Sequence, residues 1–544
     1  MSLRVLWSAW SNDPFTETIE RQLARAIAEA GGTLLRITEG RRPDETPIPT
    51  IDLQDACLVD ARPQAASVPP PGFDRIVTET HEFERIEGLA STREEVDARL
   101  RRCAEHAELI LDRFRPRVVM VWNGLLSQRA VVALDACSRN TPVYYCERGM
   151  LPGSWYADPV GINAAGSLVC EPLAPGLRET LDSPLAPQQR QAVLEALAAA
   201  SRAGASAWGQ PAPRGPDAWR ESLGIPENVK ILFFPLQVGA DTNMTRFSPH
   251  FADSVAALEA VAEALAGRDD WFLLVKPHPR GNYPAGRVEQ IAARVRGAVA
   301  DVNMHDALAL ASLVVTINSN AGAEAVWAGK PVLQLGRGIL SDKSIVADYA
   351  PDRPMLEQIR QAVDIWSREP DRFDRGLRLY RYLREEFLLQ ADSIDDACRL
   401  VRRLAAAAGP VSDAPDDDPT PLVRRFTWRP AVDLFDRIGR RPAVRNAVLV
   451  GFGQNALRLL QAAPLHPVGR SLCWSAWDDD ETSREHARKR GLPLTDPFSR
   501  TISEDTLLVV TPRDAHDLGR RLADRGYRAE AQWLHLFQPA GQPR

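Results

Sequence analysis

Short apolar segments alternate with longer amphipathic segments along most of the chain, and this alternation is what most constrains its fold. Within residues 1–203, the runs RVLWSAW, VVMVWN and VYYCE are separated by stretches with the helical periodicity of about 3.6 residues. Short apolar runs between helices are typical of buried parallel strands. The pattern therefore predicts an α/β lobe built on a parallel sheet.

The same arrangement begins again at residue 218 and continues to residue 408. KILFFPLQ, WFLLVK, LVVTIN and PVLQLG are predicted strands, and HFADSVAALEAVAEALAG is a predicted helix between the first two. Two successive α/β units predict a doubly wound, two-lobed protein with a cleft between the lobes.

Two proline-rich segments mark the expected domain boundaries. One is GASAWGQPAPRGPDAW, at residues 204–219, and the other is GPVSDAPDDDPTP, at residues 409–421. Acidic and turn-forming residues of this kind cannot bury an apolar face, so the second segment is a predicted linker. We expect an N-terminal lobe at 1–203, a second lobe at 218–408 and a small C-terminal α/β domain at 422–544.

The charge balance and the cysteines exclude some classes of protein. The chain has 66 Lys and Arg against 72 Asp and Glu, so no broad basic field supports a nucleic-acid partner. Its 7 Cys form no C-x-x-C pattern, and their odd number favours reduced thiols. No run approaches the ~18–20 apolar residues of a transmembrane helix, and the N-terminus lacks the pattern of a signal peptide. We expect a cytoplasmic protein, at most peripheral at the inner face of the membrane.

The segment WFLLVKPHPRGNYP, at residues 271–284, carries two cationic side chains at the end of a predicted strand. Lys276 and His278 alternate along the chain, so both are expected to point the same way where the strand ends. Ligands of open α/β sheets bind outside that end. Lysine supplies a point charge, histidine supplies a hydrogen-bond donor, and Pro279 stiffens the turn, so we expect a phosphate site. The alternative is a proline-rich turn with a solvated lysine.

A second motif, LVVTINSNAGAEAVWAGKPVLQLG at residues 313–336, predicts a strand, a helix that begins near Ser319 and Asn320, and another strand. Either polar residue can cap the helix, whose free N–H groups and dipole favour an anion. We expect Gly322 to let a ligand approach the backbone and Glu324 to accept a hydrogen bond from a ribose hydroxyl. The alternative is a βαβ unit with ordinary capping.

A third motif, FFPLQVGADTNM at residues 233–244, ends a predicted strand at Gln237 and continues into a loop with Asp241 and Asn243. A carboxylate on such a loop is a candidate nucleophile or base. Gln237 and Asn243 are candidates for contact with the substrate. An Asx turn or a helix N-cap accounts for Asp241 equally well.

A fourth motif, VYYCERGMLPGSWYADPVGIN at residues 143–163, carries Glu147 from a predicted strand to a glycine turn. A glutamate in this place is a candidate general acid or base. Asn163, further along, is a candidate for contact with the substrate. The alternative for Glu147 is a carboxylate on a surface loop.

Other patterns carry weaker signals. GFGQNA, at residues 451–456, follows a strand but lacks the third glycine of a dinucleotide fingerprint, so a packing turn is the favoured interpretation. The runs Asp416–Asp418 and Asp478–Asp480 are expected to be solvated acidic loops. The histidines outside 271–284 are isolated, so we expect no metal site and no cofactor.

Taken in order, ERGMLPGSWYADPVGIN, PLQVGADTN, LLVKPHP and INSNAGAEAVWAGKPVLQLG resemble the capsule polysaccharide synthesis family, which includes KpsC- and KpsS-type β-Kdo transferases. The resemblance covers about residues 120–345. It implies a GT-B-type glycosyltransferase with two Rossmann-like lobes, the first on the acceptor side and the second on the nucleotide-sugar side. It also implies transfer of Kdo or a similar 2-keto sugar acid from a CMP-sugar to a glycan or glycolipid acceptor. A membrane-associated polysaccharide assembly complex is an implied partner.

By this resemblance, Lys276 and His278 would hold the CMP phosphate, with Ser319, Asn320 and Glu324 nearby. CMP leaves as a monophosphate, so a lysine, a histidine and a helix N-terminus can neutralise it without a metal. That expectation agrees with the lack of a metal-binding pattern in the sequence.

The resemblance also assigns the two carboxylates. Glu147 resembles the family's acid/base, and Asp241 resembles the carboxylate that attacks the anomeric carbon, which implies a glycosyl-enzyme intermediate and retention of configuration. Two features depart from the family pattern. Arg148 follows Glu147 where an acidic residue or His is common, and residues 422–544 have no counterpart.

Three alternatives stay open from the sequence. The first alternative is a sialyltransferase-like or other nucleotide-sugar transferase. Bacterial sialyltransferases also hold CMP with a His-Pro motif and a serine at a later helix start. A non-catalytic scaffold of a polysaccharide assembly complex is the second, although Glu147, Asp241, Lys276 and His278 are all present. A nucleotide-dependent oxidoreductase in residues 422–544 is the third, and the incomplete glycine pattern argues against it.

Overall fold

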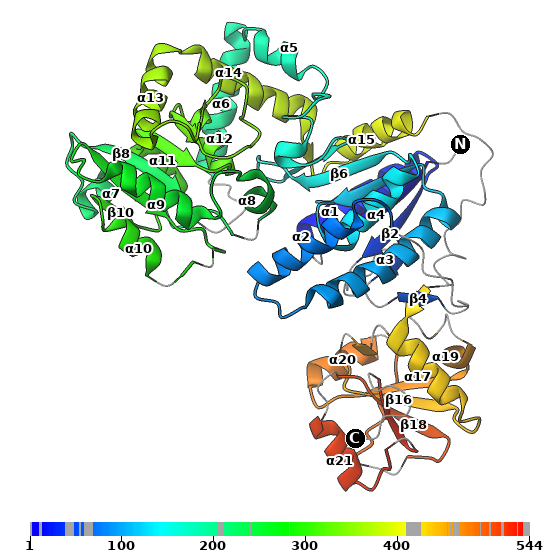
Figure 1. The fold of residues 1–544 in the computed structure, drawn as a ribbon. Coiled ribbons are helices and arrows are strands. Elements are labelled where there is room, and N and C mark those ends of the chain that lie inside the picture. The colour runs from blue at the N-terminus through cyan, green and yellow to red at the C-terminus, as the bar shows by residue number, and fades with distance from the viewer. Residues whose placement is uncertain are drawn as a thin grey trace.

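The chain folds into two α/β lobes and a smaller α/β domain, seen in a computed structural model (Figure 1). The description covers residues 3–536 except for 10–12, 39–47, 54–55, 59–68, 204–209, 240, 282, 285, 410–425, 454, 457–458, 461–462, 464–466, 490, 500–501, 513–515 and 530.

The first lobe, lobe 1, is built on a sheet with the strand order β14-β7-β6-β5-β1-β2-β3. The strands from β3 to β6 pair in parallel, while β7 and β14 pair antiparallel. Their bounds are β1 Arg4–Ala9, β2 Thr33–Thr38, β3 Thr50–Asp52, β5 Val118–Trp122, β6 Val143–Arg148, β7 Ser154–Asp158 and β14 Leu389–Gln390. The predicted parallel sheet is therefore present, with an antiparallel edge.

Helices cover both faces of this sheet because each carries one apolar stripe. α1 (Pro14–Glu29) and α15 (Ile394–Ala407) pack on one face. α2 (Phe73–Ile86), α3 (Arg93–Phe114) and α4 (Ser127–Ser138) pack on the other. Buried aliphatic residues from both faces of each strand explain why the strand segments read as continuous apolar runs.

The second lobe, lobe 2, has an all-parallel sheet with the order β10-β9-β8-β11-β12-β13. The strands are β8 Lys230–Pro235, β9 Trp271–Lys276, β10 Gly297–Val299, β11 Leu313–Thr316, β12 Val332–Gln334 and β13 Ala347–Asp348. The helices are α7 Pro216–Ser222, α8 Thr242–Phe247, α9 Ser254–Leu265, α10 Arg287–Ala292, α11 Met304–Leu310, α12 Asn320–Trp327, α13 Met355–Arg368 and α14 Asp371–Tyr382. The order of the strands reverses between β8 and β11, which makes this the switch point of the sheet.

The two lobes exchange segments, which corrects the expected boundaries at residues 203 and 408. α5 (Leu177–Asp182) and α6 (Pro187–Ala203) pack against α14 of lobe 2. In the other direction, β14 extends the sheet of lobe 1 and α15 lies along α1. The chain therefore crosses between the lobes after β7 and again before β14.

The third domain has a four-stranded parallel sheet with the order β17-β16-β18-β19 and its own apolar core. Its elements are β16 Asn446–Val450, β17 Cys473–Trp477, β18 Thr506–Val510, β19 Trp533–His535, α17 Arg429–Gly439, α19 Pro467–Ser471, α20 Glu481–Lys489 and α21 His516–Asp524. A short strand, β15 (Phe426–Trp428), joins it to lobe 1 by pairing antiparallel with β4 (Ala56–Leu58). The expected linker, with Asp416–Asp418, lies outside the described residues apart from Gly409.

The glycine turn after β16 is a packing turn. Gly451 has φ +85°, and a Cβ at this position would come within 2.6 Å of Pro512. Asn455 Nδ2 donates to the Thr511 carbonyl at 3.1 Å, so the loops after β16 and β18 are bonded to each other. The glycine thus serves the packing of this turn against the loop after β18.

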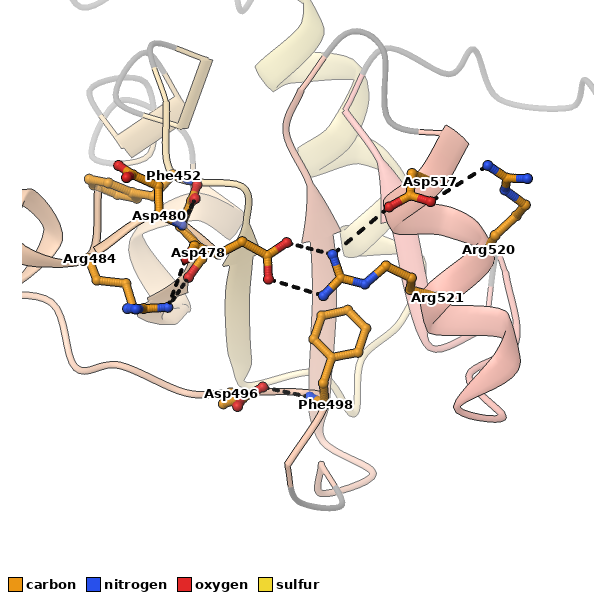
Figure 2. A network of polar contacts seen from close by, with 10 residues as sticks. Phe452, Asp478, Asp480, Arg484, Asp496, Phe498, Asp517, Arg520 and Arg521 are labelled. Carbon is orange, nitrogen blue, oxygen red and sulfur yellow. Dashed lines mark hydrogen bonds and ion pairs between the residues drawn. The ribbon is translucent and has the colours of Figure 1, made fainter. Parts of the chain in front are cut away.

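The acidic run Asp478–Asp480 is a largely exposed loop, as expected from the sequence, and its carboxylates also belong to a polar network (Figure 2). Asp478 Oδ2 accepts the backbone N–H of Phe452 at 2.6 Å. Both carboxylate oxygens of Asp479 face the guanidinium of Arg521, at 2.5 and 3.1 Å. These bonds tie the loop after β17 to the loop after β16 and to α21.

Two truncations test the exchange of segments. A chain that ends at residue 409 is expected to keep both lobes folded, whereas a chain that ends at residue 388 is expected to lose the fold of lobe 1. α15 buries Leu400, Val401 and Leu404, and burying each such side chain contributes ~1.5–3 kcal/mol. Their sum is comparable with the ~5–15 kcal/mol that stabilises a whole domain.

Circular dichroism melting of the two truncated chains beside the full chain measures the effect. Equal melting of both truncated chains would contradict the assignment of α15 to lobe 1.

Candidate active site

Loops from both lobes meet where α8 lies at the border of the lobes (Figure 1). In lobe 2 the expected residues Gln237 and Asp241 follow β8, Ser319 follows β11, and His278 follows the neighbouring β9. α8 lies against the short helix η1 (Asn163–Ala165), which follows β7 of lobe 1. The candidate site is therefore built at the switch point of lobe 2 and faces lobe 1.

Glu147 lies near the end of β6, and both oxygens of its carboxylate are held. Oε2 accepts a hydrogen bond from Asn123 Nδ2 at 3.0 Å, and Oε1 accepts the backbone N–H of Arg148 at 2.9 Å. Burial raises the pKa of Glu147, the two hydrogen bonds lower it, and the negative charge of Asp241 raises it. The balance is a pKa above that of an ordinary glutamate, on a carboxyl of fixed orientation.

Asn123 positions Glu147, and the sequence analysis did not find it. The residue follows β5 with φ +62°, its N–H donates to the Cys146 carbonyl at 2.7 Å, and Gly124 follows with φ +74°. Asparagine enters this left-handed region more readily than most residues. An Asn-Gly pair directly after a buried strand is the sequence signal for this turn.

Asp241 is the N-cap of α8, as the simpler interpretation of the sequence predicted. Its Oδ1 accepts the N–H of Asn243 at 2.8 Å. Burial raises the pKa of Asp241, while the hydrogen bonds from Asn243 and the charge of His278 lower it. The surrounding protein thus desolvates the carboxylate, although part of the residue's surface still reaches solvent. The capping role fixes where the carboxylate sits, at the N-terminus of α8 beside His278.

His278 begins a tight turn that a tyrosine holds in place. Gly281 N–H donates to the His278 carbonyl at 2.8 Å, which puts the exposed Pro279 in the first corner of the turn. A Cβ at Gly281 would meet the Tyr283 ring at 2.2 Å, so only glycine leaves room for that ring. The Tyr283 hydroxyl donates to the Gln237 carbonyl at 3.2 Å and joins this turn to the end of β8.

The side chain of Lys276 lies beneath this turn. It is 4% exposed, and Nζ forms an ion pair with Asp301 Oδ1. Burial lowers the pKa of His278, the charge of Asp241 raises it, and the charges of Arg280 and Lys276 lower it. As the alternation in the sequence predicts, the charge of Lys276 acts on His278. The lysine is already paired with the Asp301 carboxylate.

These mutual shifts link three groups from two lobes. The charge of Asp241 acts on the pKa of Glu147 in lobe 1 and on the pKa of His278 in lobe 2. The Asp241 carboxylate thus acts on both groups, and α8, which it caps, is bonded to lobe 1 through Arg246 and the Leu125 carbonyl at 2.8 Å. This arrangement suits a reaction that needs a nucleophile and a base near an anionic leaving group.

The helix after β11 starts at Ser319, whose hydroxyl accepts the N–H of Ala321 at 3.2 Å, and Asn320 is exposed in its first turn. Burial raises the pKa of Glu324, one turn further on, to about 7. Gly322 has a different role from the one expected. A Cβ there would meet the Thr316 side chain at 3.2 Å, so this glycine permits close packing of α12 on the sheet.

A buried pair of amides holds the loops of lobe 2 together. Gln237 Nε2 donates to Asn318 Oδ1 at 2.9 Å, and Asn318 N–H donates to Gln237 Oε1 at 3.1 Å. Asn318 Nδ2 lies within 3.1 Å of three carbonyl oxygens, those of Asn243, Phe247 and Arg337. Gln237 therefore joins β8 to β11, and its amide is bonded to protein, whereas the sequence analysis expected a contact with substrate. Asn318 was not found from the sequence.

Asn163 begins η1 with φ +52°, and its Oδ1 accepts the hydroxyl of Tyr156 at 3.3 Å. Tyr156 pairs with Glu147 across β6 and β7, so Asn163 is one side chain away from the candidate base. The loop between β7 and η1 is held by the buried Asp158, whose Oδ2 accepts the N–H of Ser167 at 2.8 Å.

Arg148, the departure from the family pattern, is directed toward α1. Its guanidinium pairs with Asp13 at 2.8 Å and lies over the Phe15 ring, 4.2 Å from the ring centre. Asp13 is the N-cap of α1. The side chain of Arg148 therefore joins the end of β6 to α1, while the backbone N–H of the same residue donates to the Glu147 carboxylate.

Two kinds of feature are absent from the part of the chain that the structure describes. No group of three or more His, Cys, Asp or Glu side chains in those residues is placed to hold a metal ion. Among the same residues, no helix combines the length and the apolar character needed to cross a bilayer.

Two Rossmann-like lobes and a C-terminal helix that returns to the first lobe define a GT-B-type fold. Residues 215–365 match the model of a family described as "Capsule polysaccharide biosynthesis protein". The resemblance found in the motifs is thereby confirmed for this segment, which contains Asp241, His278 and Ser319. The segment around Glu147 lies outside the matched residues.

Individual relatives share part of the chain. Protein FixF of Sinorhizobium fredii is 26% identical over 230 residues, which are 42% of this chain and 50% of FixF. The chain thus spans about half the length of this curated relative.

Solved structures of Thermosulfurimonas dismutans KpsC are also similar. Its beta Kdo 2,7 transferase is 18% identical to this chain, with a TM-score of 0.32. The similarity covers 52% of this chain and 85% of the transferase chain. Its beta Kdo 2,4 transferase is 18% identical, with 46% and 79% covered and a TM-score of 0.31.

The amide pair generates a stability prediction. Asn318→Ala is expected to lower the free energy of unfolding of lobe 2 by about 2–4 kcal/mol, because buried carbonyls and the Gln237 amide lose their partner. Asn320→Ala, on the exposed first turn of α12, is the control and is expected to stay within about 0.5 kcal/mol of wild type. Scanning calorimetry of the full-length variants measures both. An Asn318→Ala variant as stable as the control would contradict the role given to the amide pair.

Proposed function

We propose that the protein is a glycosyltransferase of capsule or surface polysaccharide biosynthesis that transfers Kdo or a similar 2-keto sugar acid from a CMP-sugar. The observation that carries the proposal is the bonding of α8, which has Asp241 at its N-cap, to the lobe 1 loop that holds Glu147 through Asn123. The family match over residues 215–365 supports the process, and the GT-B-type fold supports the reaction class. The acceptor is a glycan or glycolipid.

The donor nucleotide is expected on lobe 2, outside the ends of β9 and β11. His278 and Lys276 supply positive charge or hydrogen bonds to the CMP phosphate, and the N-terminus of α12 at Ser319 and Asn320 adds its dipole. Glu324, with its pKa raised to about 7, is suited to donate or accept a hydrogen bond with a ribose hydroxyl at neutral pH. No metal or cofactor is part of this proposal.

The proposed reaction has two displacements. In the first, a carboxylate oxygen of Asp241 bonds to the anomeric carbon, and the bond from that carbon to the phosphate oxygen breaks, so CMP leaves with the electron pair. In the second, the acceptor hydroxyl oxygen bonds to the same carbon, and the bond to Asp241 breaks. Glu147 takes the hydroxyl proton. Two inversions give net retention of configuration.

The environment of each carboxylate fits its proposed role. Asp241 must be ionised to attack, and against the effect of burial, which raises its pKa, the hydrogen bonds from Asn243 favour the ionised form. Glu147 must accept a proton near neutral pH, and its raised pKa makes it a stronger base than an ordinary glutamate. The bonds from Asn123 and Arg148 hold its carboxylate in one orientation.

Two other functions stay in competition with this one. A sialyltransferase-like enzyme would use the same CMP contacts with a different sugar acid. A non-catalytic scaffold would keep the fold without turning over a sugar donor. Turnover of CMP-Kdo against CMP-sialic acid separates the first alternative, and the absence of turnover with either supports the second.

The nucleotide site is tested by binding of CMP. His278→Ala and Lys276→Ala are each expected to weaken CMP binding by about 10–150-fold, because each removes a contact to a charged group worth roughly 1.5–3 kcal/mol. Lys489→Ala in the third domain is the matched control, since that lysine is 72% exposed and pairs only with the neighbouring Glu485 among the ion pairs of the described residues. Titration calorimetry with CMP measures all three. Unchanged affinity in both site variants would refute the assignment.

The two carboxylates are tested by turnover. Asp241→Asn is expected to abolish transfer from CMP-Kdo while CMP affinity changes little, because the nucleotide contacts lie on other strands. Glu147→Gln is expected to slow transfer by about 10²–10⁴-fold, since it removes the proton acceptor. It should also let a sugar adduct on Asp241 accumulate, which intact-protein mass spectrometry detects.

The pH profile adds a second readout of the same pair. A base works when ionised, so kcat should fall as the pH decreases through the raised pKa of Glu147, at a higher pH than for an ordinary glutamate. Because the two carboxylates interact, this limb belongs to the pair. Normal turnover by Asp241→Asn would remove the double-displacement mechanism and leave Asp241 as a helix cap.

A further inference from the structure

Arg246, on the last turn of α8, connects the two lobes. Its guanidinium forms an ion pair with Glu79 on α2 of lobe 1, and the same nitrogen donates to the carbonyl of Leu125 at 2.8 Å. The side chain is only 17% exposed. Burial and the neighbouring charge of Arg75 lower the pKa of Arg246 to about 10, so the guanidinium is still charged at neutral pH.

On the lobe 1 side, the contact is continuous with Glu147. The carbonyl that Arg246 holds belongs to Leu125, whose own N–H donates to Asn123 Oδ1 at 3.2 Å. Asn123 Nδ2 then donates to Glu147 Oε2 at 3.0 Å. A displacement of Leu125 therefore acts on Glu147 through one intervening side chain.

On the lobe 2 side, the contact is continuous with Asp241. Asp241 caps the same short helix that carries Arg246 one turn later. Asn318 holds this helix at both ends, through the carbonyls of Asn243 and Phe247 at 2.8 and 3.1 Å. α8 is thus held to lobe 2 by Asn318, and Arg246 bonds it to lobe 1.

We propose that Arg246 is a positioning residue that fixes the separation of Glu147 and Asp241 by bonding α8 to the Leu125 loop. The inference rests on the proposed function for the roles of the two carboxylates. Arg246 touches neither of them in the structure and acts through α8 on one side and Asn123 on the other. The CMP contacts at His278 and Ser319 lie on other loops of lobe 2, so nucleotide affinity does not depend on this bond.

The chemistry explains why the separation matters. Asp241 must reach the anomeric carbon in the first displacement, and Glu147 must reach the acceptor hydroxyl in the second. The two groups come from different lobes, so the width of the cleft sets both distances. A misplacement of about 1 Å in a reacting group can reduce the rate by about 10²-fold.

Arg246→Met in the full chain is the first test. Glu79 keeps its pair with Arg75 at 2.8 Å, so the substitution leaves no carboxylate without a partner. We expect kcat for CMP release from CMP-Kdo to fall by about 10–100-fold, while the dissociation constant of CMP stays within about twofold of wild type. Arg246→Lys, which keeps the charge but lacks the fork of the guanidinium, should recover part of the loss.

Arg75→Gln is the matched control. Arg75 bonds to the same Glu79 from the exposed side, is 72% exposed and makes no contact with Leu125 among the described residues. It should keep the kcat of wild type. An equal loss in both variants would assign the effect to Glu79 and α2, and would overturn the proposal.

Amide hydrogen exchange gives a readout that needs no turnover. In Arg246→Met, faster exchange is expected in residues 123–127 and 242–247, with unchanged exchange in the strands of both lobes. If no sugar is transferred by any form of the protein, the proposed function fails while this structural coupling is still measured. Unchanged exchange in both segments, or a loss of CMP affinity as large as the loss of kcat, would overturn the role of Arg246.

Discussion

The reciprocal hydrogen bonds between Gln237 and Asn318 are the interaction on which the candidate site depends. A parallel sheet delivers its loops to one edge but does not fix them relative to one another. The amide pair does so at the switch point, where the chain continues from β8 to one side of the sheet and from β11 to the other. From there, Asn318 reaches α8 and the loop after β12, and Tyr283 reaches the turn with His278. Because the amides of Gln237 and Asn318 are buried and bonded, moving one loop would leave a polar atom of another loop without its hydrogen bond.

Much of the fold follows from local rules, and those parts were predictable. The spacing of apolar residues gave the strands and helices of both lobes, and capping chemistry gave the starts of α8 at Asp241 and α12 at Ser319. The exchange of α15 was not predictable, because it depends on contacts such as that from Arg117 to the Ala408 carbonyl, far apart in sequence. The role of Gly322 also escaped, since a sequence does not tell which way a missing Cβ would point.

The residues of the candidate site show the same difference between features that local patterns predict and features that depend on distant contacts. Asp241 and His278 each follow a strand and Glu147 lies near the end of one, so the topology of an α/β sheet was enough to suggest them. The residues that hold them in place, such as Asn123, Asn318 and Arg246, are ordinary polar residues whose importance comes from partners on other elements. The pKa values in the site also depend on contacts between distant parts of the chain. The raised pKa of Glu147 depends on burial and on a charge from the other lobe, which no segment of the chain carries by itself.

The return of α15 to lobe 1 has a consequence for the order in which the chain folds during synthesis. The strands of lobe 1 up to β7 have left the ribosome long before α15, which covers part of one face of the sheet, has been synthesised. Ribosomes add about 5–20 residues per second, so the apolar face formed by residues such as Val5, Val118 and Met120 waits some tens of seconds for its cover. Lobe 2, whose segments lie between the two crossings, completes first. A nascent chain halted between residues 390 and 407 would therefore be a substrate for chaperones that recognise exposed aliphatic surface.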